Sequence, residues 1–272
     1  MYTDFYQLKE NPFNMTADPD FFFASQHHEE AFSHLSYGIN QRKGILVVTG
    51  EIGTGKTTLC RTLLNRLDSN IRTALILNPN FSEIQLLKLI VKDLGIQGNL
   101  KNKLDIIEAL NKFLLFETSQ GNNVVIIIDE AQNMSIMQLE QIRLLSNLET
   151  EKEKLLQIIL VGQPELCDKL KLNALRQLNQ RVSVRYHILP LNRNELSLYI
   201  DHRLKIANLR RDLKHHLHFT EEAVDIIYRN SNGTPRMVNI LCDRALLAGY
   251  ATEASKIDEH IVNRCIQEVV HQ

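Results

Sequence analysis

The stretch Gly50-Glu51-Ile52-Gly53-Thr54-Gly55-Lys56-Thr57 decides the fold. It has the spacing GxxxxGK[ST] and directly follows an apolar run that ends at Thr49. Glycines let successive backbone N–H groups face a concavity that accepts phosphate oxygens, and a helix that follows adds its positive N-terminal end. Lys56 supplies a charge for β- and γ-phosphates, and the Thr57 hydroxyl can bind Mg²⁺. The stretch therefore predicts a phosphate-binding loop between a strand and a helix.

Short β-branched apolar runs lie on both sides of this loop and alternate with longer segments of helical period. They occupy residues 44–50, 72–78, 124–129, 156–162 and 184–191. Continuous apolar strands separated by helices indicate a parallel sheet that is buried on both faces. Apolar residues at i, i+3, i+4 and i+7 predict helices over 56–67 and 82–94, and Ser82 with Gln85 predicts a capping box for the second.

The character of the sequence changes after Leu191, because no further strand-like run follows. Asn192 with Glu195 predicts a helix start, and Asn232-Gly233-Thr234-Pro235 interrupts the helical pattern and restarts it. The helical segments are 195–208, 220–229, 236–250 and 258–270. We therefore expect an α/β domain over residues 1–192 and an all-helical domain over residues 193–272.

The composition excludes several classes of protein. The 272 residues are 44% apolar and carry 31 Lys and Arg against 32 Asp and Glu, a net charge of −1. This balance argues against disorder and against a generally basic nucleic-acid or membrane binder. The four cysteines show no CxxC spacing, which gives no signal for zinc or a redox pair. We see no secretory signal and no apolar run near the ~20 residues that span a bilayer, so we expect a soluble, cytoplasmic protein.

A second signal is the run Val124–Ile128 followed by Asp129 and Glu130. A carboxylate at the carboxyl end of a buried strand, in the sheet that carries the phosphate-binding loop, can hold the Mg²⁺ bound by Thr57. Glu130 can then polarise a water molecule for in-line attack on a γ-phosphate. An apolar run ending in Asp-Glu is common by itself, but together with the loop it predicts ATP hydrolysis as well as binding.

Three weaker candidates follow along the chain. Gln163 comes just after a strand, where its amide can orient the attacking water or merely make local hydrogen bonds. Arg181 precedes the last strand, where another subunit can pack, and an arginine delivered in trans contributes about 10³–10⁵ in rate. Arg176 and Arg185 compete for that role, and surface charge is the alternative. Arg236 opens a helix of the second domain and can report which phosphate is present, or be an ordinary surface residue.

With these residues, the chain resembles an AAA+ ATPase over nearly its whole length. GEIGTGKT resembles Walker A and VVIIIDE resembles Walker B, while Gln163, Arg181 and Arg236 stand where sensor 1, an arginine finger and sensor 2 are expected. More narrowly, the chain resembles the ExeA/GspA group. The stretches that carry this resemblance are FYQLKENPFNMTADPDFFF, GEIGTGKTTLCR, IIIDEAQNM, LSNLET, ILVGQPEL, LNQRVSVRYHI and GTPRMVN.

The resemblance implies a P-loop NTPase fold, with a parallel five-stranded sheet flanked by helices and a C-terminal helical lid. It implies ATP and Mg²⁺ as cofactors, with Gly50–Thr58 around the phosphates, Thr57 and Asp129 at the metal, and Thr58 as part of the loop. Within an N-terminal segment 1–43, Asn11, Pro12 and Phe13 would lie near the adenine.

The resemblance also implies partners. These are further copies of the chain and an inner-membrane secretion or pilus assembly protein, which would hold a cytoplasmic protein peripherally at the inner membrane. The short chain looks like the relatives associated with type IV (MSHA-type) pilus biogenesis, or like a domain of a longer protein.

Three hypotheses of function remain open at this point. The first is an oligomeric, Mg²⁺-dependent ATPase that drives assembly of an envelope complex. The second is a DNA-associated AAA+ ATPase, such as a transposition regulator or helicase loader, because HRLKIANLRRDLKHHLH at 202–218 is basic and includes Arg203. A solvated lid helix and loop is the plainer interpretation of that stretch. The third is a nucleotide-gated adaptor whose slow hydrolysis times the release of a partner.

Overall fold

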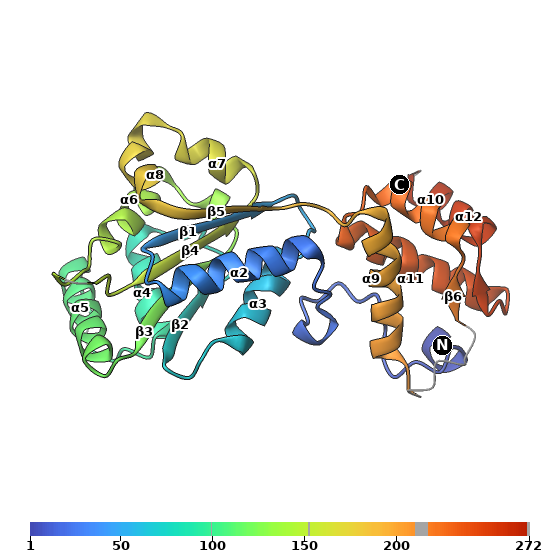
Figure 1. Cartoon of the computed structure of the whole chain (residues 1–272), viewed down its shortest axis with the longest axis horizontal. Helices are drawn as coiled ribbons and strands as arrows, with labels where there is room; N and C mark the ends of the chain where they lie inside the picture. The colour runs from blue at the N-terminus through green and yellow to red at the C-terminus, as the bar shows by residue number, and fades with distance from the viewer. Residues whose placement is uncertain (99, 152, 210–216, 271–272) are drawn as a thin grey trace. The chain divides into compact units, whose positions relative to one another are not determined.

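A parallel five-stranded sheet forms the centre of the computed structural model, which describes residues 1–98, 100–151, 153–209 and 217–270 (Figure 1). The strand order is β2-β3-β4-β1-β5, and every neighbouring pair is parallel. All five strands predicted from the apolar runs are confirmed. They are β1 (Ile45–Gly50), β2 (Ile71–Ile76), β3 (Asn123–Ile128), β4 (Gln157–Gly162) and β5 (Val182–Ile188).

The chain divides into two compact units. The sheet unit comprises Gln26–Glu51 and Leu59–Ile188, and the helical unit comprises Met1–Ser25, Ile52–Thr58 and Leu189–Gln272. The change near residue 189 lies close to the expected boundary at 192. Residues 1–25 and 52–58 differ from our expectation of a 1–192 domain, because they group with the C-terminal helices and not with the sheet.

Helices cover both faces of the sheet. The helices are α2 (Gln26–Asn40), α3 (Lys56–Arg66), α4 (Glu83–Asp93), α5 (Lys103–Ser119), α6 (Ile136–Leu145), α7 (Glu165–Leu170) and α8 (Arg176–Arg181), with 3-10 turns η2 (Ala131–Asn133) and η3 (Asn173–Leu175). The predicted capping box at the start of α4 is confirmed, since Ser82 and Gln85 exchange side-chain to backbone hydrogen bonds.

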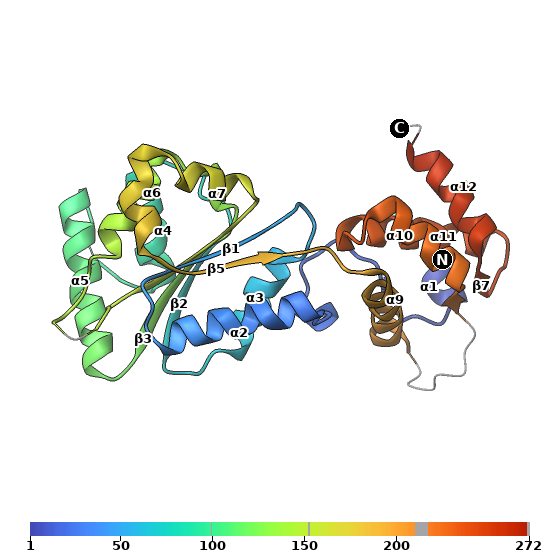
Figure 2. The same ribbon diagram turned by 45° about the horizontal axis from the view of Figure 1, so that its top comes forward.

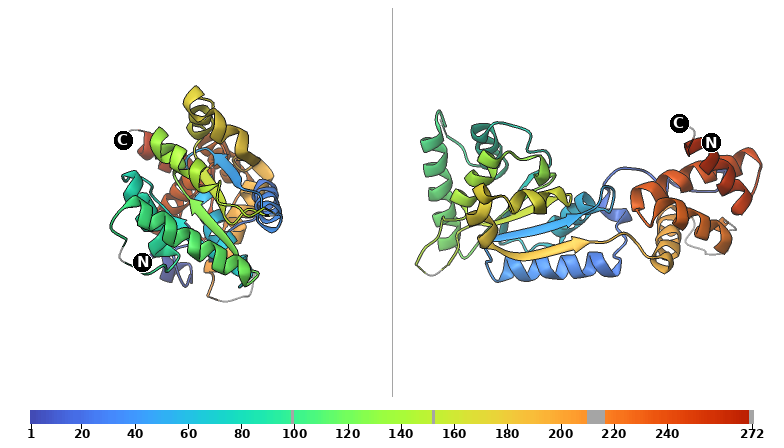
Figure 3. Two further views of the ribbon diagram at one scale, coloured as in Figure 1. Left: turned by 90° about the vertical axis from the view of Figure 1, so that its left-hand side faces the viewer. Right: turned by 90° about the horizontal axis from the view of Figure 1, so that it is seen from above.

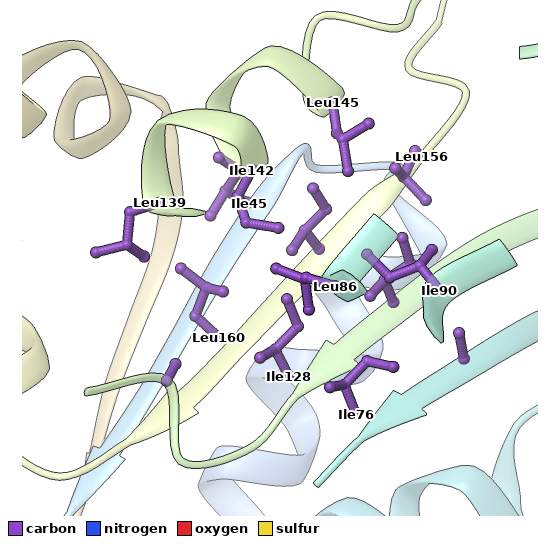
Figure 4. Packing of buried hydrophobic residues seen from close by; sticks show 14 of the residues in the cluster. Ile45, Ile76, Leu86, Ile90, Ile128, Leu139, Ile142, Leu145, Leu156 and Leu160 are labelled. Carbon is purple, nitrogen blue, oxygen red and sulfur yellow. The ribbon is translucent and has the colours of Figure 1, made fainter. Parts of the chain in front are cut away.

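One face of the sheet packs against α4, α5, α6 and α8 in a single buried apolar cluster. Alternate strand residues point to this face, as the two-residue period of a strand requires. Figure 4 shows part of the cluster, with Ile45, Ile76, Ile128 and Leu160 from the strands, Leu86 and Ile90 from α4, and Leu139, Ile142 and Leu145 from α6. The continuous apolar strands in the sequence therefore reflect burial on both faces.

The other face carries α2 and α3, which Figure 2 shows together on this side of the sheet. Gly38 of α2 lies against Leu46 of β1, and a Cβ on Gly38 would stand 2.1 Å from a Leu46 methyl carbon. The Tyr186 hydroxyl on β5 donates to the Glu30 carboxylate of α2 at 2.7 Å. These contacts fix α2 across β1 and β5.

The edge strand β2 is closed by an acidic side chain. The backbone N–H of Leu75 donates to Asp93 Oδ2 at 2.6 Å, and Asp93 is the last residue of α4. The unpaired N–H and C=O groups of an edge strand attract further strands. Asp93 accepts the hydrogen bond of one such N–H group, which is then not available to another strand.

The helical unit is built from α9 (Arg193–Ala207), α10 (Glu221–Ser231), α11 (Pro235–Ala251) and α12 (Glu259–Val270), preceded along the chain by α1 (Tyr2–Phe5) and η1 (Pro19–Phe21). The predicted cap is confirmed, because Asn192 accepts from the Glu195 N–H. Our expectation of no strand after Leu191 is wrong. The two-residue strands β6 (His218–Phe219) and β7 (Lys256–Ile257) form a parallel pair, and strands of two residues are too short to leave a periodic signal.

The N-terminal segment is fastened to the helical unit by Arg203 of α9. The guanidinium is 5% exposed and donates to the carbonyl oxygens of Pro12 at 2.5 Å and Asn14 at 3.1 Å. It also lies 4.8 Å from the centre of the Phe21 ring. Figure 3 shows the N-terminus beside the C-terminal helices. These contacts explain why residues 1–25 belong to this unit.

In the described part of the chain, every helix is too short or too polar to cross a membrane.

Replacing Arg203 should unfold the helical unit more easily. Arg203→Ala leaves the Pro12 and Asn14 carbonyl oxygens without their donors, and we expect a loss of about 2–4 kcal/mol in the free energy of unfolding. Lys205→Ala, at an exposed position of the same helix, should cost no more than about 0.5 kcal/mol. Urea denaturation followed by circular dichroism measures both. Equal stability of the two variants would contradict the anchoring role of Arg203.

Candidate functional site

The parallel direction of the strands brings three chain segments to one edge of the sheet. β4 lies between β1 and β3 in the strand order, and Thr49 of β1 pairs with Gly162 of β4. The segments that follow β1, β3 and β4 therefore start at neighbouring positions of the same edge. The crevice outside the carboxyl ends of parallel strands is where such sheets bind ligands.

The loop that follows β1 has the local geometry of a phosphate-binding turn. Gly53 and Gly55 adopt positive φ angles of 80° and 91°, a region that glycine enters without steric cost. Lys56 is the first residue of the eleven-residue helix α3 and is 5% exposed. The strand, turn and helix predicted around residues 50–57 are thus all present. A turn of this geometry directly before the N-terminus of a helix is the arrangement that suits an anion.

Arg236 meets this loop through its backbone. Its N–H donates to the carbonyl oxygen of Gly53 at 3.2 Å, and both residues belong to the helical unit. A Cβ on Gly53 would stand 2.5 Å from Arg236 Cβ and 3.2 Å from the Thr234 methyl carbon. Glycine at position 53 is therefore required for this contact as well as for its positive φ. Pro235 opens α11 at its first position, as its fixed φ predicts.

Asp129 and Glu130 follow β3 in a strained turn. Asp129 is buried, its N–H donates to the Ile76 carbonyl oxygen at 2.8 Å, and its Oδ1 accepts from the Glu130 N–H at 2.8 Å. Glu130 itself is left-handed, with φ 54° and ψ 34°. Non-glycine residues in this region cost about 1–3 kcal/mol and cluster at functional sites. The strain is localised on the acid that we expect to activate water.

Two side-chain amides contact the Glu130 carboxylate at the same oxygen. Gln132 Nε2 donates to Glu130 Oε2 at 2.5 Å, and Gln163 Nε2 donates to it at 3.5 Å. The structure thus places the predicted candidate Gln163 beside Glu130. Gln132 was not predicted as a site residue, because a glutamine in a short turn has no periodicity or spacing that marks it.

The three arginine candidates near β5 differ in their surroundings. The Arg185 guanidinium donates to Asn179 Oδ1 at 2.6 Å and to the Asn179 carbonyl oxygen at 3.1 Å. Arg176 and Arg181 begin and end α8, and both side chains are exposed. Arg181 directly precedes the edge strand β5, as expected. The local hydrogen bonds of Arg185 make it the poorest candidate to reach another subunit.

The structure places Asn11, Pro12 and Phe13 within the helical unit. Asn11 Nδ2 donates to Asp243 Oδ1 at 2.9 Å, and Asn11 Oδ1 accepts from the Phe13 N–H at 2.8 Å. The Phe13 side chain is 2% exposed and packs edge to face with Phe219. Its ring therefore serves the core of this unit, and contact of this segment with adenine stays a prediction.

One arginine of the basic stretch at 202–218 is not available for the expected contact with phosphates. Arg203 is buried and binds backbone carbonyl oxygens, so counting it as a surface charge was wrong. Residues 210–216 of this stretch, including Arg210, Arg211 and Lys214, lie outside the described residues. The described part offers less positive surface than its composition suggests.

Comparisons with known proteins bear on the family of the chain. The family described as AAA domain matches residues 39–170, which include the loop after β1 and the segments that follow β3 and β4. The chain is 39% identical over 270 residues to General secretion pathway protein A of Aeromonas hydrophila. The match covers 99% of this chain and 48% of that protein. The chain is an ExeA/GspA-like AAA+ protein. It spans about half the length of that relative.

Solved structures support the AAA+ fold. The Aeropyrum pernix ORC2 protein in its ADP form has a TM-score of 0.70 at 17% identity, covering 96% of this chain and 73% of that one. For Drosophila ORC bound to DNA the TM-score is 0.68 at 17% identity, and the match covers 99% of this chain and 65% of that one. For the Thermotoga maritima RuvB Holliday junction branch migration motor the TM-score is 0.57 at 17% identity, and the match covers 97% of this chain and 72% of that one. At these identities the ExeA/GspA-like protein shares a fold with them.

Proposed function

We propose that this protein binds ATP with Mg²⁺, hydrolyses the ATP, and works in oligomers to assist assembly of a secretion or type IV pilus envelope complex. The observation that carries this proposal is the shared edge of the sheet. The segment with Lys56 and Thr57 leaves this edge after β1, and the Asp129–Glu130 pair leaves it after β3.

The residues present suit a nucleotide with Mg²⁺. Backbone N–H groups of Gly50–Thr58 and the Lys56 ammonium would bind the phosphates, since turns with positive φ and helix starts favour anions. Thr57 and the buried carboxylate of Asp129 would hold Mg²⁺, which prefers such oxygen ligands. The bound metal would neutralise charge that develops on the transferred phosphoryl group.

Glu130 would act on the water. Its carboxylate would accept a hydrogen bond from the attacking water and draw the water toward the γ-phosphate, as general bases do in this chemistry. The Gln163 amide, beside Glu130 at 3.5 Å, would help to orient that water. Arg181 from a second copy would stabilise the negative charge of the transition state. Arg236 would report on the phosphates through the start of α11, where its N–H already contacts Gly53.

The name of the Aeromonas relative motivates the proposed setting. That protein is a General secretion pathway protein A, and its similarity extends along 99% of this chain. We propose a cytoplasmic protein that reaches the inner membrane through an assembly partner of a secretion or pilus system. The DNA-associated alternative is weakened, because Arg203 is buried and unavailable to a phosphate backbone.

Glu130→Gln should separate binding from hydrolysis. The amide keeps the size of the side chain but is a far weaker base, so we expect ATP affinity within a factor of about 2 and turnover reduced about 10²–10⁴-fold. Steady-state ATPase assays and titration with a fluorescent ATP analogue measure the two quantities. Glu108→Gln, at an exposed position of α5, is the matched control. Wild-type turnover in Glu130→Gln would refute the assignment.

Arg181→Ala should make hydrolysis independent of protein concentration. An arginine supplied in trans contributes about 10³–10⁵ in rate, so activity per subunit should rise with wild-type concentration and stay flat and low in the variant. Arg185→Ala, whose guanidinium is bound to Asn179, should behave like wild type.

A mixing experiment tests the trans geometry. Arg181→Ala subunits retain Glu130, and Glu130→Gln subunits retain Arg181, so mixed oligomers should recover ATPase activity that neither variant shows alone. An absence of recovery, with both variants folded and able to oligomerise, would exclude Arg181 as a residue supplied by a neighbouring copy. A wild-type rate that is fast at every concentration would exclude it as well.

A further inference from the structure

The Glu130 carboxylate is connected by one side chain to the loop that follows β4. Gln132 Nε2 donates to Glu130 Oε2 at 2.5 Å, while Gln132 Oε1 accepts from the backbone N–H of Gln163 at 3.1 Å. The same amide therefore contacts an acid on the β3 side and a backbone donor on the β4 side. All three residues lie in the sheet unit.

We propose that Gln132 is a positioning residue for Glu130. It holds the Glu130 carboxylate at a fixed distance from the loop after β4, so that the acid and the Gln163 amide face the attacking water together. This inference rests on the proposed ATP hydrolysis. Because both amides contact Oε2, the attacking water would contact Oε1.

The contact pattern requires a glutamine at position 132. An amide has one acceptor oxygen and one donor nitrogen, which match the Gln163 N–H and the Glu130 carboxylate. A glutamate would keep the acceptor and lose the donor, and it would place a second negative charge beside Glu130. An asparagine is one methylene shorter and would not reach both partners from the same backbone position.

Gly162 makes room for this side chain. A Cβ at Gly162 would stand 2.8 Å from Gln132 Oε1 and 3.2 Å from the Gln132 backbone nitrogen. Gly162 is the last residue of β4, and only glycine fits there because the Gln132 amide lies against it. The end of β4 and the turn after β3 are therefore in close contact at Gly162 and Gln132.

The backbone of Gln132 is also held in place. Lys169 of α7 donates through Nζ to the carbonyl oxygens of Gln132 at 2.5 Å and Met134 at 2.8 Å. Ala131 and Met134, on either side, are fully buried. Because these contacts hold the backbone of the turn, the length of the Gln132 side chain sets the position of the carboxylate. A rigid supporting contact of this kind is what precise placement of a reacting group requires.

Kinetics of Gln132 variants test the proposal. We expect Gln132→Ala to lower kcat about 10²-fold, the scale of a misplaced reacting group, with KM and ATP affinity within about 2-fold of wild type. Gln132→Glu should be as slow, because it lacks the donor. Gly162→Ala should also lower kcat, since its methyl group displaces the same amide. Wild-type kcat in folded Gln132→Ala would overturn the inference.

Two further measurements separate positioning from a purely structural role. In the background of Glu130→Gln, the change Gln132→Ala should slow hydrolysis no further, because Gln132 acts through Glu130. Additive losses in this double variant would overturn the proposal. Gln138→Ala is the matched control: this buried glutamine donates to the Pro79 and Phe81 carbonyl oxygens and accepts from the Ser135 N–H, and its loss should lower stability with kcat unchanged.

The same variants distinguish the positioning role of Gln132 from the proposed ATP hydrolysis on which it rests. If Glu130→Gln retains wild-type turnover, the proposed hydrolysis by Glu130 fails and the role of Gln132 fails with it. If Glu130→Gln is inactive while folded Gln132→Ala is fully active, the proposed function stands and only the positioning role is excluded. Thermal denaturation of each variant verifies that a loss of kcat does not come from unfolding.

Discussion

The common direction of the five strands is the constraint on which the rest of the structure depends. A parallel ladder sends every strand toward the same edge, and the order β2-β3-β4-β1-β5 sets β4 between the two strands that carry the main motifs. An apolar cluster on one face and the contacts of α2 on the other cover this ladder, and the turns at its carboxyl edge start from positions that the strands set. The strained backbone of Glu130 is tolerated there because Ile128 and Ala131 on either side are buried.

The features that a local pattern marks could be predicted from the sequence, and those that depend on a contact between distant residues could not. Strands covered on both faces must be continuously apolar, and helix starts need capping groups such as Ser82 and Asn192, so both could be predicted. The place of residues 1–25 could not, because it depends on Arg203, which is 191 positions beyond Pro12. Arg203 looks like a surface charge in a basic stretch, and local composition contains no information on which arginine turns inward.

The candidate site shows the same division. Lys56, Thr57, Asp129 and Glu130 could be proposed because each stands at a set position relative to the end of a strand, where phosphate and metal chemistry demand these residue types. Gln132 could not, since its importance comes from a neighbour 31 residues away, Gln163, and from the missing Cβ of Gly162. Contacts between two turns depend on the strand order, and the sequence does not state that order.

The bond between Asp93 and the Leu75 backbone gives the sheet two unlike borders. At β2 a carboxylate already satisfies an outward-facing amide, and it would repel the carbonyl oxygens of an incoming chain. Continuous growth of the ladder from one molecule to the next is therefore blocked on that side. A neighbouring copy at this border would therefore have to pack through side chains and helices, because the backbone donor of Leu75 is already taken.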